Sequence, residues 1–249
     1  KSANLSWHAV PLGPMLSEAI GGVPVYVENV SNAAALGEKV YGSGQGYENL
    51  IYLNLSVGIS AGVIVNDKVF GGARGYAGEV GHVAVVPEGG PLCSCGRYGC
   101  FEAICGARAV LQRIRQETPA EVLATVGIDN AKLSISHLID TQLARTPDVS
   151  RILRETGEVI GLVIANLISL FDTRLVILGG ELSRLDDAFL DSVVRSVNKH
   201  GLEDIVEGVR IVRSTMRDDP GLMGTYALAI ERVFAMEDWE SGNERVDYA

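Results

Sequence analysis

All four cysteines of this chain lie within a single short stretch, from Cys93 to Cys105. Three of them follow an upstream histidine in the pattern H-x10-C-x-C-x4-C, formed by His82, Cys93, Cys95 and Cys100. Three thiolates and one imidazole are a ligand set that suits tetrahedral Zn²⁺. The sequence therefore predicts a zinc-stabilised loop over residues 82–100. Protein ligands would fill all four positions, so we expect a structural zinc and not a catalytic one.

The residues between and after these ligands support the prediction. Gly96 and Gly99 allow the backbone to fold tightly around an ion. Cys105 lies five residues beyond Cys100, and we expect it on the next helix as a packed thiol. The alternative is that the cysteines are buried free thiols and His82 is a core histidine. Three cysteines with intervening glycines and an upstream histidine favour the metal, and crowded thiols in a chain of this size indicate a reducing cytoplasm.

Charge and hydropathy exclude two classes of partner. The chain has 249 residues, enough for one large or two modest domains, and a formal net charge of -10. That balance repels phosphate backbones, so we expect no direct binding of nucleic acid by this chain. The start lacks the pattern of a signal peptide, and the most apolar stretch, which begins at Val159, is too short to span a bilayer. We expect a cytoplasmic protein without a membrane partner.

Periodicity and turn signals predict alternating strands and helices. Ser31 is a candidate N-cap and Gly42 a stop for one helix, and Asn66-Asp67 is a candidate tight turn. We expect strands in 23–29, twice around 58–62, after the Asn66-Asp67 turn, at the start of 173–184 and in 207–214. We expect helices over 31–42, 107–117 and 221–234, a long buried helix over 148–172, and short helices over 119–148. Strands alternating with helices predict an α/β fold with a mixed sheet flanked by helices.

The cysteine stretch carries a resemblance to a known family. "AGEVGHVAVVPEGGPLCSCGRYGCFEAICG" resembles the signature region of the ROK family (repressors, open reading frames and kinases), in which an E-x-G-H element precedes a C-x-C-G-x-x-G-C-x-E loop. "PVYVENVSNAAALGE" resembles the family's sugar-contact segment, and "LVILGG" and "GLMGTYALAI" its nucleotide-side segments. The resemblance runs from about Asn4 to about Phe234. It implies the actin-like ATPase (ribonuclease-H-like) fold, with a remnant of the first lobe and hinge in 1–43 and the second lobe in 44–249.

The resemblance also implies a sugar site. It assigns sugar contacts to Asn29, Glu79, His82 and Glu102. Carboxylate and amide oxygens suit sugar hydroxyls, because each hydroxyl both donates and accepts. His82 would bind zinc through one ring nitrogen and face the sugar through the other. The alternative for Glu79 and Glu102 is that they are solvated loop carboxylates.

The chain departs from the family's kinases at the residues that catalyse phosphorylation. The family's catalytic aspartate follows the asparagine, and here that position is Val30, which cannot accept a proton. The phosphate loop, usually Gly-Thr-Gly-Ile-Gly, has serines at 56 and 60. The remaining nucleotide-side glycines, which we expect to form only a degenerate nucleotide site, are Gly58, Gly62, Gly179 and Gly180.

These departures favour one function among three. We expect the sugar-sensing domain of a ROK transcriptional regulator, which binds a monosaccharide or derivative without phosphorylating it and takes no ATP. DNA would be bound only through a segment outside these 249 residues. The alternatives are an ATP-dependent hexose kinase and an enzyme-derived subunit without a ligand. We also expect a homo-oligomer, for which the apolar helix around Ile164 is a candidate interface.

Overall fold

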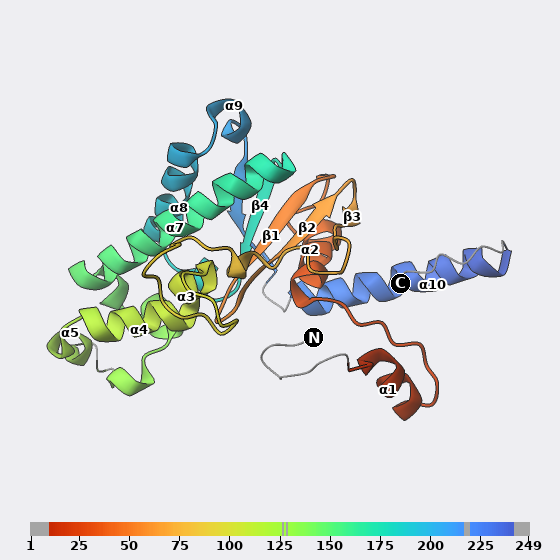
Figure 1. The fold of residues 1–249 in the computed structure, drawn as a ribbon, viewed down its shortest axis with the longest axis horizontal. Helices are drawn as coiled ribbons and strands as arrows, with labels where there is room; N and C mark the ends of the chain where they lie inside the picture. The colour runs from red at the N-terminus through yellow and green to blue at the C-terminus, as the bar shows by residue number, and fades with distance from the viewer. Residues whose placement is uncertain (1–9, 126, 128, 217–219, 242–249) are drawn as a thin grey trace.

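The computed structural model describes residues 10–125, 127, 129–216 and 220–241. Its centre is one five-stranded sheet with the strand order β3-β2-β1-β4-β5. The strands are β1 (Leu50–Leu55), β2 (Ile59–Val65), β3 (Lys68–Val69), β4 (Leu175–Gly179) and β5 (Arg210–Arg213). The first three pair antiparallel, and β4 and β5 run parallel to β1 (Figure 1). This mixed sheet with flanking helices confirms the predicted α/β architecture.

The turn between β2 and β3 forms where its sequence predicts it. Asn66 and Asp67 both have positive φ, of 50° and 65°. A two-residue hairpin with both central residues at positive φ matches the right-handed twist of its strands, and Asn and Asp tolerate that conformation. The short β3 therefore follows β2 directly.

The two faces of the sheet are covered by different helices. Along β1, Ile51 and Leu53 pack into a large core with α7 (Pro147–Phe171) and α8 (Asp187–His200). The alternating residues Leu50 and Tyr52 face a smaller core beneath α2. Helices α2 (Val30–Tyr41) and α10 (Pro220–Ser241) pack against each other on this second side. The fold thus has three layers, with the sheet in the middle (Figure 1).

The other elements connect or extend these layers. They are α1 (Leu12–Ala19), η1 (Val80–His82), α3 (Phe101–Cys105), α4 (Ala107–Glu117), α5 (Ala120–Thr125), η2 (Asn130–Lys132), α6 (Ile135–Asp140), η3 (Gln142–Arg145), η4 (Leu182–Arg184) and α9 (Glu203–Val206). The short helices between α4 and α7 and the long α7 agree with the predictions for 119–148 and 148–172. None of the described helices combines the length and apolar composition that crossing a membrane requires.

The strand predicted over 23–29 does not form. These residues have no regular secondary structure, and nearly all of them are exposed. A strand needs a neighbour to take up its backbone N–H and C=O groups, and no described strand lies beside this segment. β-rich composition is therefore not sufficient here. Residues 1–9, the start of the predicted first-lobe remnant, lie outside the described residues.

The start of α2 also differs from its prediction. The N-cap is Asn29 and not Ser31, because the Asn29 Oδ1 accepts a hydrogen bond from the Ser31 N–H at 2.8 Å. Either side chain can cap a helix. The C-cap is Gly42, as predicted.

The apolar middle of α7 forms core within the chain. Ile164 is fully buried there, and α7 packs along α8. This residue is therefore not available for the oligomer interface considered from the sequence. At the C-terminal end of α7, Leu170 is 76% exposed.

Candidate functional site

The four predicted zinc ligands come together in the structure. One potential ligand atom each from His82, Cys93, Cys95 and Cys100 lies within 4.8 Å of all the others. The Nδ1 of His82 is 3.6 Å from the Sγ of Cys93, and the Sγ atoms of Cys95 and Cys100 are 3.7 Å apart. All four cysteines of the chain are free thiols.

These separations fit a tetrahedral zinc site. With Zn–S bonds of about 2.3 Å and a Zn–N bond of about 2.0–2.1 Å, the tetrahedral edges are about 3.8 Å between two sulfurs and about 3.6 Å between nitrogen and sulfur. The observed distances of 3.7 Å and 3.6 Å match both edges. The cluster is therefore consistent with zinc. A bound ion would cross-link η1 to the loop that precedes α3.

The backbone of the loop supplies the geometry. The Cys93 N–H donates to the Arg97 carbonyl at 2.8 Å, and the Gly96 N–H donates back to Cys93 at 2.9 Å, which closes a tight knuckle. Gly99 has a φ of 68°, and a Cβ there would lie 1.6 Å from the Val86 carbonyl oxygen. Gly96 has a φ of 85°. Both glycines are thus needed for their backbone conformation, as the sequence indicates.

The thiols differ in their readiness to ionise. Burial opposes ionisation of Cys95, but hydrogen bonds from the Arg97 backbone and side chain and from neighbouring thiols lower its pKa to about 6. Burial is also the main reason that the pKa of Cys100 is raised. Cys105 is fully buried, and burial raises its pKa strongly. Its thiol lies 3.9 Å from the Thr156 carbonyl, outside the cluster, as predicted for a packed thiol.

The two ring nitrogens of His82 face different groups. Its Nδ1 lies against Cys93 in the metal cluster, and its Nε2 lies 3.9 Å from a carboxylate oxygen of Glu79. The side chain of Glu79 is 45% exposed and that of His82 is 25% exposed. The histidine therefore joins the metal cluster on one side to an accessible carboxylate on the other.

Glu102 bridges two segments near the cluster. One carboxylate oxygen accepts the backbone N–H of Ile59, at the start of β2, at 3.1 Å. The other accepts the hydroxyl of Ser94, inside the cysteine knuckle, at 3.3 Å. Glu102 is thus a structured carboxylate and not a freely solvated one.

Asn29 lies at the start of α2. Its amide oxygen caps the helix, and it makes no hydrogen bond to Glu79, His82 or Glu102 in the described structure. The neighbouring Glu28 accepts hydrogen bonds from the Asn29 N–H at 2.7 Å and from the Asn32 side-chain amide at 2.9 Å. Glu28 therefore turns onto the first turn of α2.

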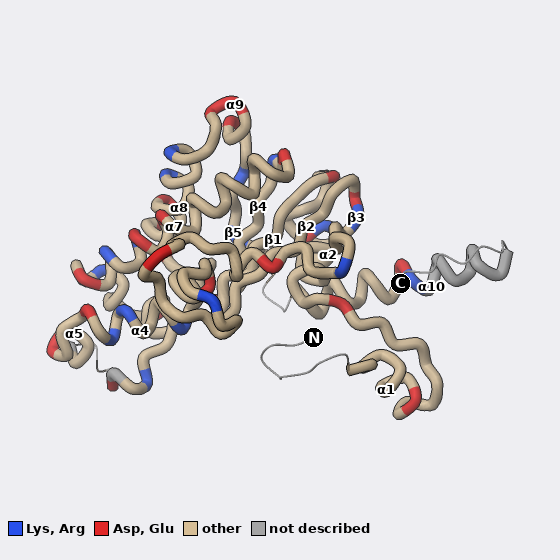
Figure 2. Tube along the Cα trace, in the orientation of Figure 1, with Lys and Arg blue, Asp and Glu red and all other residues tan. Residues whose placement is uncertain are grey.

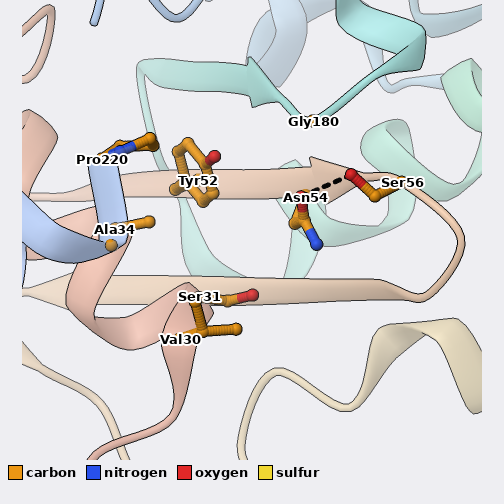
Figure 3. Close-up of a pocket in the computed structure, with 9 residues that line it drawn as sticks. Val30, Ser31, Ala34, Tyr52, Asn54, Ser56, Gly180 and Pro220 are labelled. Carbon is orange, nitrogen blue, oxygen red and sulfur yellow. Dashed lines mark hydrogen bonds between the residues drawn. The ribbon is translucent and has the colours of Figure 1, made fainter. Parts of the chain in front are cut away.

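A pocket of about 200 Å³ opens where β1 and β4 end, beside the first turns of α2 and α10 (Figure 3). Its lining is Val30, Ser31, Ala34, Tyr52, Asn54, Ser56, Gly180, Pro220 and Gly221, and contains no charged side chain. The Ser56 hydroxyl donates to the Asn54 side chain at 3.3 Å and accepts the Glu181 N–H at 3.3 Å. A second pocket of about 250 Å³ shares part of this lining and extends to Arg184.

The four predicted nucleotide-side glycines are not equivalent. Gly180 lines both pockets and Gly179 the second, at the end of β4. Gly62 lies instead under α2, where a Cβ would be 2.0 Å from the Ser31 carbonyl oxygen. Gly58 lies near Glu102, with space for a Cβ 3.4 Å from its carboxylate. Neither Gly58 nor Gly62 lines a pocket described above.

Sequence reasoning missed two polar residues at these sites. Asn54 is the one amide side chain in the apolar run of β1, and this contrast was visible in the sequence. Ser94 stands between two candidate metal ligands, and only the structure shows its contact with Glu102.

Comparisons with known proteins agree with this geometry. Residues 1–232 match the model of the ROK family. The xylose repressor of Caldicellulosiruptor bescii is 31% identical over 95% of this chain and 59% of its own length. This chain thus spans somewhat more than half of that relative.

Two solved structures extend the comparison. A ROK family glucokinase from Streptomyces griseus, in complex with glucose and AMPPNP, has a TM-score of 0.82 and 30% identity, over 93% of this chain and 76% of that one. A ROK family transcriptional regulator, a homolog of the E. coli MLC protein, has a TM-score of 0.74 and 26% identity, over 86% of this chain and 55% of that one. From the family match over residues 1–232, together with its fold and His/Cys cluster, we conclude that the chain belongs to the ROK family.

Proposed function

We propose that this chain is the sugar-sensing domain of a ROK-family transcriptional regulator, which binds a monosaccharide or derivative without phosphorylating it. The observation that carries the proposal is the position of Val30. It lines the pocket at the ends of β1 and β4, where the resemblance places the kinase aspartate, and no carboxylate lines that pocket. A positioned base contributes roughly 10²–10⁴-fold to such proton transfers.

The serines of the altered phosphate loop support the same proposal. Ser56 occupies the Glu181 N–H, a backbone donor that would otherwise be free for an anion. Ser60 pairs with Ser31, hydroxyl to hydroxyl, at 2.6 Å, and so ties β2 to the first turn of α2. The side chains of Ser56 and Ser60 therefore occupy space and a backbone N–H donor that a phosphate loop leaves open.

The sugar would be bound beside the metal cluster. Glu79 lies beside the Nε2 of His82, and Glu102 contacts Ser94 of the cysteine loop, so both carboxylates adjoin the cluster. Asn29 would join them from the start of α2, where its amide nitrogen is free to donate. Zinc, held by His82 and the three cysteines, would keep this side rigid without acting on the substrate.

The remaining parts of the proposal concern the whole protein. A net charge of -10 makes this chain itself a poor ligand for DNA, so DNA would be contacted through a segment outside it. Charges of both signs lie together where α4 packs beside the first half of α7, because Arg113 and Arg151 pair there with Glu117 and Glu155 (Figure 2). We further propose that the protein is cytoplasmic and assembles as a homo-oligomer.

A hexose kinase is the second candidate. It is favoured by the likeness to the Streptomyces griseus glucokinase, at 30% identity and a TM-score of 0.82. Under that alternative another carboxylate, such as Glu28 or Glu79, would serve as base. Glu28 is engaged with the first turn of α2, which argues against it.

Two measurements on the full-length gene product separate the candidates. A coupled assay of ADP release with ATP and D-glucose or D-xylose should give no sugar-dependent turnover, with a ROK glucokinase as positive control. The same sugars should raise the melting temperature, because a ligand that binds only the folded state stabilises it. Sugar-dependent turnover would establish the kinase instead. A flat melting temperature across a panel of monosaccharides and their phosphates would refute sugar sensing.

A further inference from the structure

Ser94 makes a contact that its position in the metal loop does not require. It stands between Cys93 and Cys95, and its hydroxyl donates to the Glu102 carboxylate at 3.3 Å. A serine hydroxyl has one proton to donate. The Cys93 Sγ lies farther away, at 3.8 Å. The carboxylate is the stronger of the two acceptors because it is charged.

This contact completes the orientation of Glu102. Its other oxygen is held by the Ile59 N–H at 3.1 Å, so the two oxygens are fixed by two different segments. A glutamate side chain has several rotatable bonds, and one hydrogen bond leaves rotation about the carboxyl group possible. With two partners, the direction of the remaining lone pairs is defined. Sugar hydroxyls are recognised through such directions.

The position of Ser94 is fixed by the two cysteines on either side of it. Cys93 is 4% exposed, and its backbone is closed onto Arg97 and Gly96 by hydrogen bonds of 2.8 Å and 2.9 Å. Zinc held by the cysteines on either side would fix the Ser94 backbone further. The chain of contacts thus runs from the metal loop through one hydroxyl to Glu102, and from Glu102 to β2.

We propose that Ser94 is a positioning residue, through which the metal loop orients Glu102 for the sugar. The inference rests on the proposed function, because Glu102 must contact a sugar for its orientation to matter. Ser94 acts through Glu102 and is not itself a sugar ligand. Removing its hydroxyl weakens sugar binding while the metal site stays loaded.

Isothermal titration of the full-length protein with D-glucose and with D-xylose tests this, with zinc content and melting temperature measured for every variant. Ser94→Ala should weaken binding about 5- to 10-fold, within the range expected for the loss of one ordinary hydrogen bond. Ser94→Thr keeps the hydroxyl and should restore the wild-type affinity. Ser150→Ala, which removes an exposed serine hydroxyl of α7, is the matched control and should change nothing.

The outcomes are distinguishable. Wild-type protein that binds neither sugar overturns the proposed function, and this inference with it. Wild-type binding with equal affinity in Ser94→Ala overturns the inference alone. Loss of zinc in Ser94→Ala would show that Ser94 supports the metal loop and does not position Glu102. Failure of Ser94→Thr to restore binding would show that the hydroxyl is not the group that orients Glu102. Either result also overturns the inference.

Discussion

Substitution of one cluster thiol tests the metal centre most directly. Cys95→Ser replaces the thiolate 3.7 Å from Cys100 by a hydroxyl, which is a poor zinc ligand at neutral pH. Cys95 is the exposed member of the three cysteines, so the change creates no buried cavity. In the metal-free loop its pKa of about 6 makes the thiolate available at pH 7. We expect zinc to fall from about one per chain to near zero.

The size of the stability loss follows from linkage. An ion that binds only the folded chain, at a free concentration of about 100 Kd, stabilises it by about 2.7 kcal/mol. For a chain of this size each kcal/mol corresponds to roughly 2–4 °C in melting temperature. The variant should therefore melt about 5–11 °C below the zinc-loaded wild type. The two should differ little after the wild type is stripped with a chelator.

The assay is metal analysis by plasma mass spectrometry, paired with thermal melts in zinc-buffered medium. Cys105→Ala is the matched control, because Cys105 is a buried thiol outside the cluster. It should lower the melting temperature through lost packing and yet retain zinc. Freshly purified wild-type protein without zinc, or full zinc retention in Cys95→Ser, would refute the assignment of these ligands.

Three further predictions concern the sugar, catalysis and pH. Glu102→Ala should abolish the sugar-dependent rise in melting temperature while zinc stays bound; a retained rise would remove Glu102 from the sugar site. Val30→Asp should add an acceptor near the sugar without giving ATP turnover in a coupled assay, because Ser56 still occupies the Glu181 N–H; turnover would show that the loop remains competent. Glu155→Gln should cost less than ~1 kcal/mol at pH 7, since its side chain is 35% exposed. The hydrogen bond from Arg113 lowers the pKa of Glu155 from 4.5, so its contribution is present above about pH 4.5 and lost as pH falls through the folded value. Urea unfolding at pH 7 and pH 3 should show a smaller difference between variant and wild type at pH 3.

The features predicted correctly are those whose stabilising contacts lie between residues close together in the sequence. The candidate zinc ligands can be predicted from their spacing, because three of them lie within eight residues and the loop around them folds through its own hydrogen bonds. The Asn66-Asp67 hairpin and the helix ended by Gly42 are equally local. In each case the partners that stabilise the element are close neighbours in sequence.

The strand expected over 23–29 was wrong for the complementary reason. Its residues are β-rich, but a strand is completed by a partner that can lie anywhere in the chain, and here no described strand is beside it. Because residues 23–29 do not form a strand, Asn29 can cap α2 in place of Ser31. For the same reason, Glu28 can accept a hydrogen bond from the Asn32 side chain in the first turn of α2.

Only the tertiary structure decided which residues share a site. Parallel pairing of β1 with β4 brings Asn54 next to Gly179, and the packing of α2 over the sheet adds Val30 to the same pocket. Glu102 meets Ile59 although 43 positions separate them. The sequence by itself determined the candidate metal ligands, the family resemblance and the valine at position 30, since these depend on residue type at fixed spacing. The pocket around Val30 and the contacts of Glu102 depend on distances across the fold, which residue spacing does not encode.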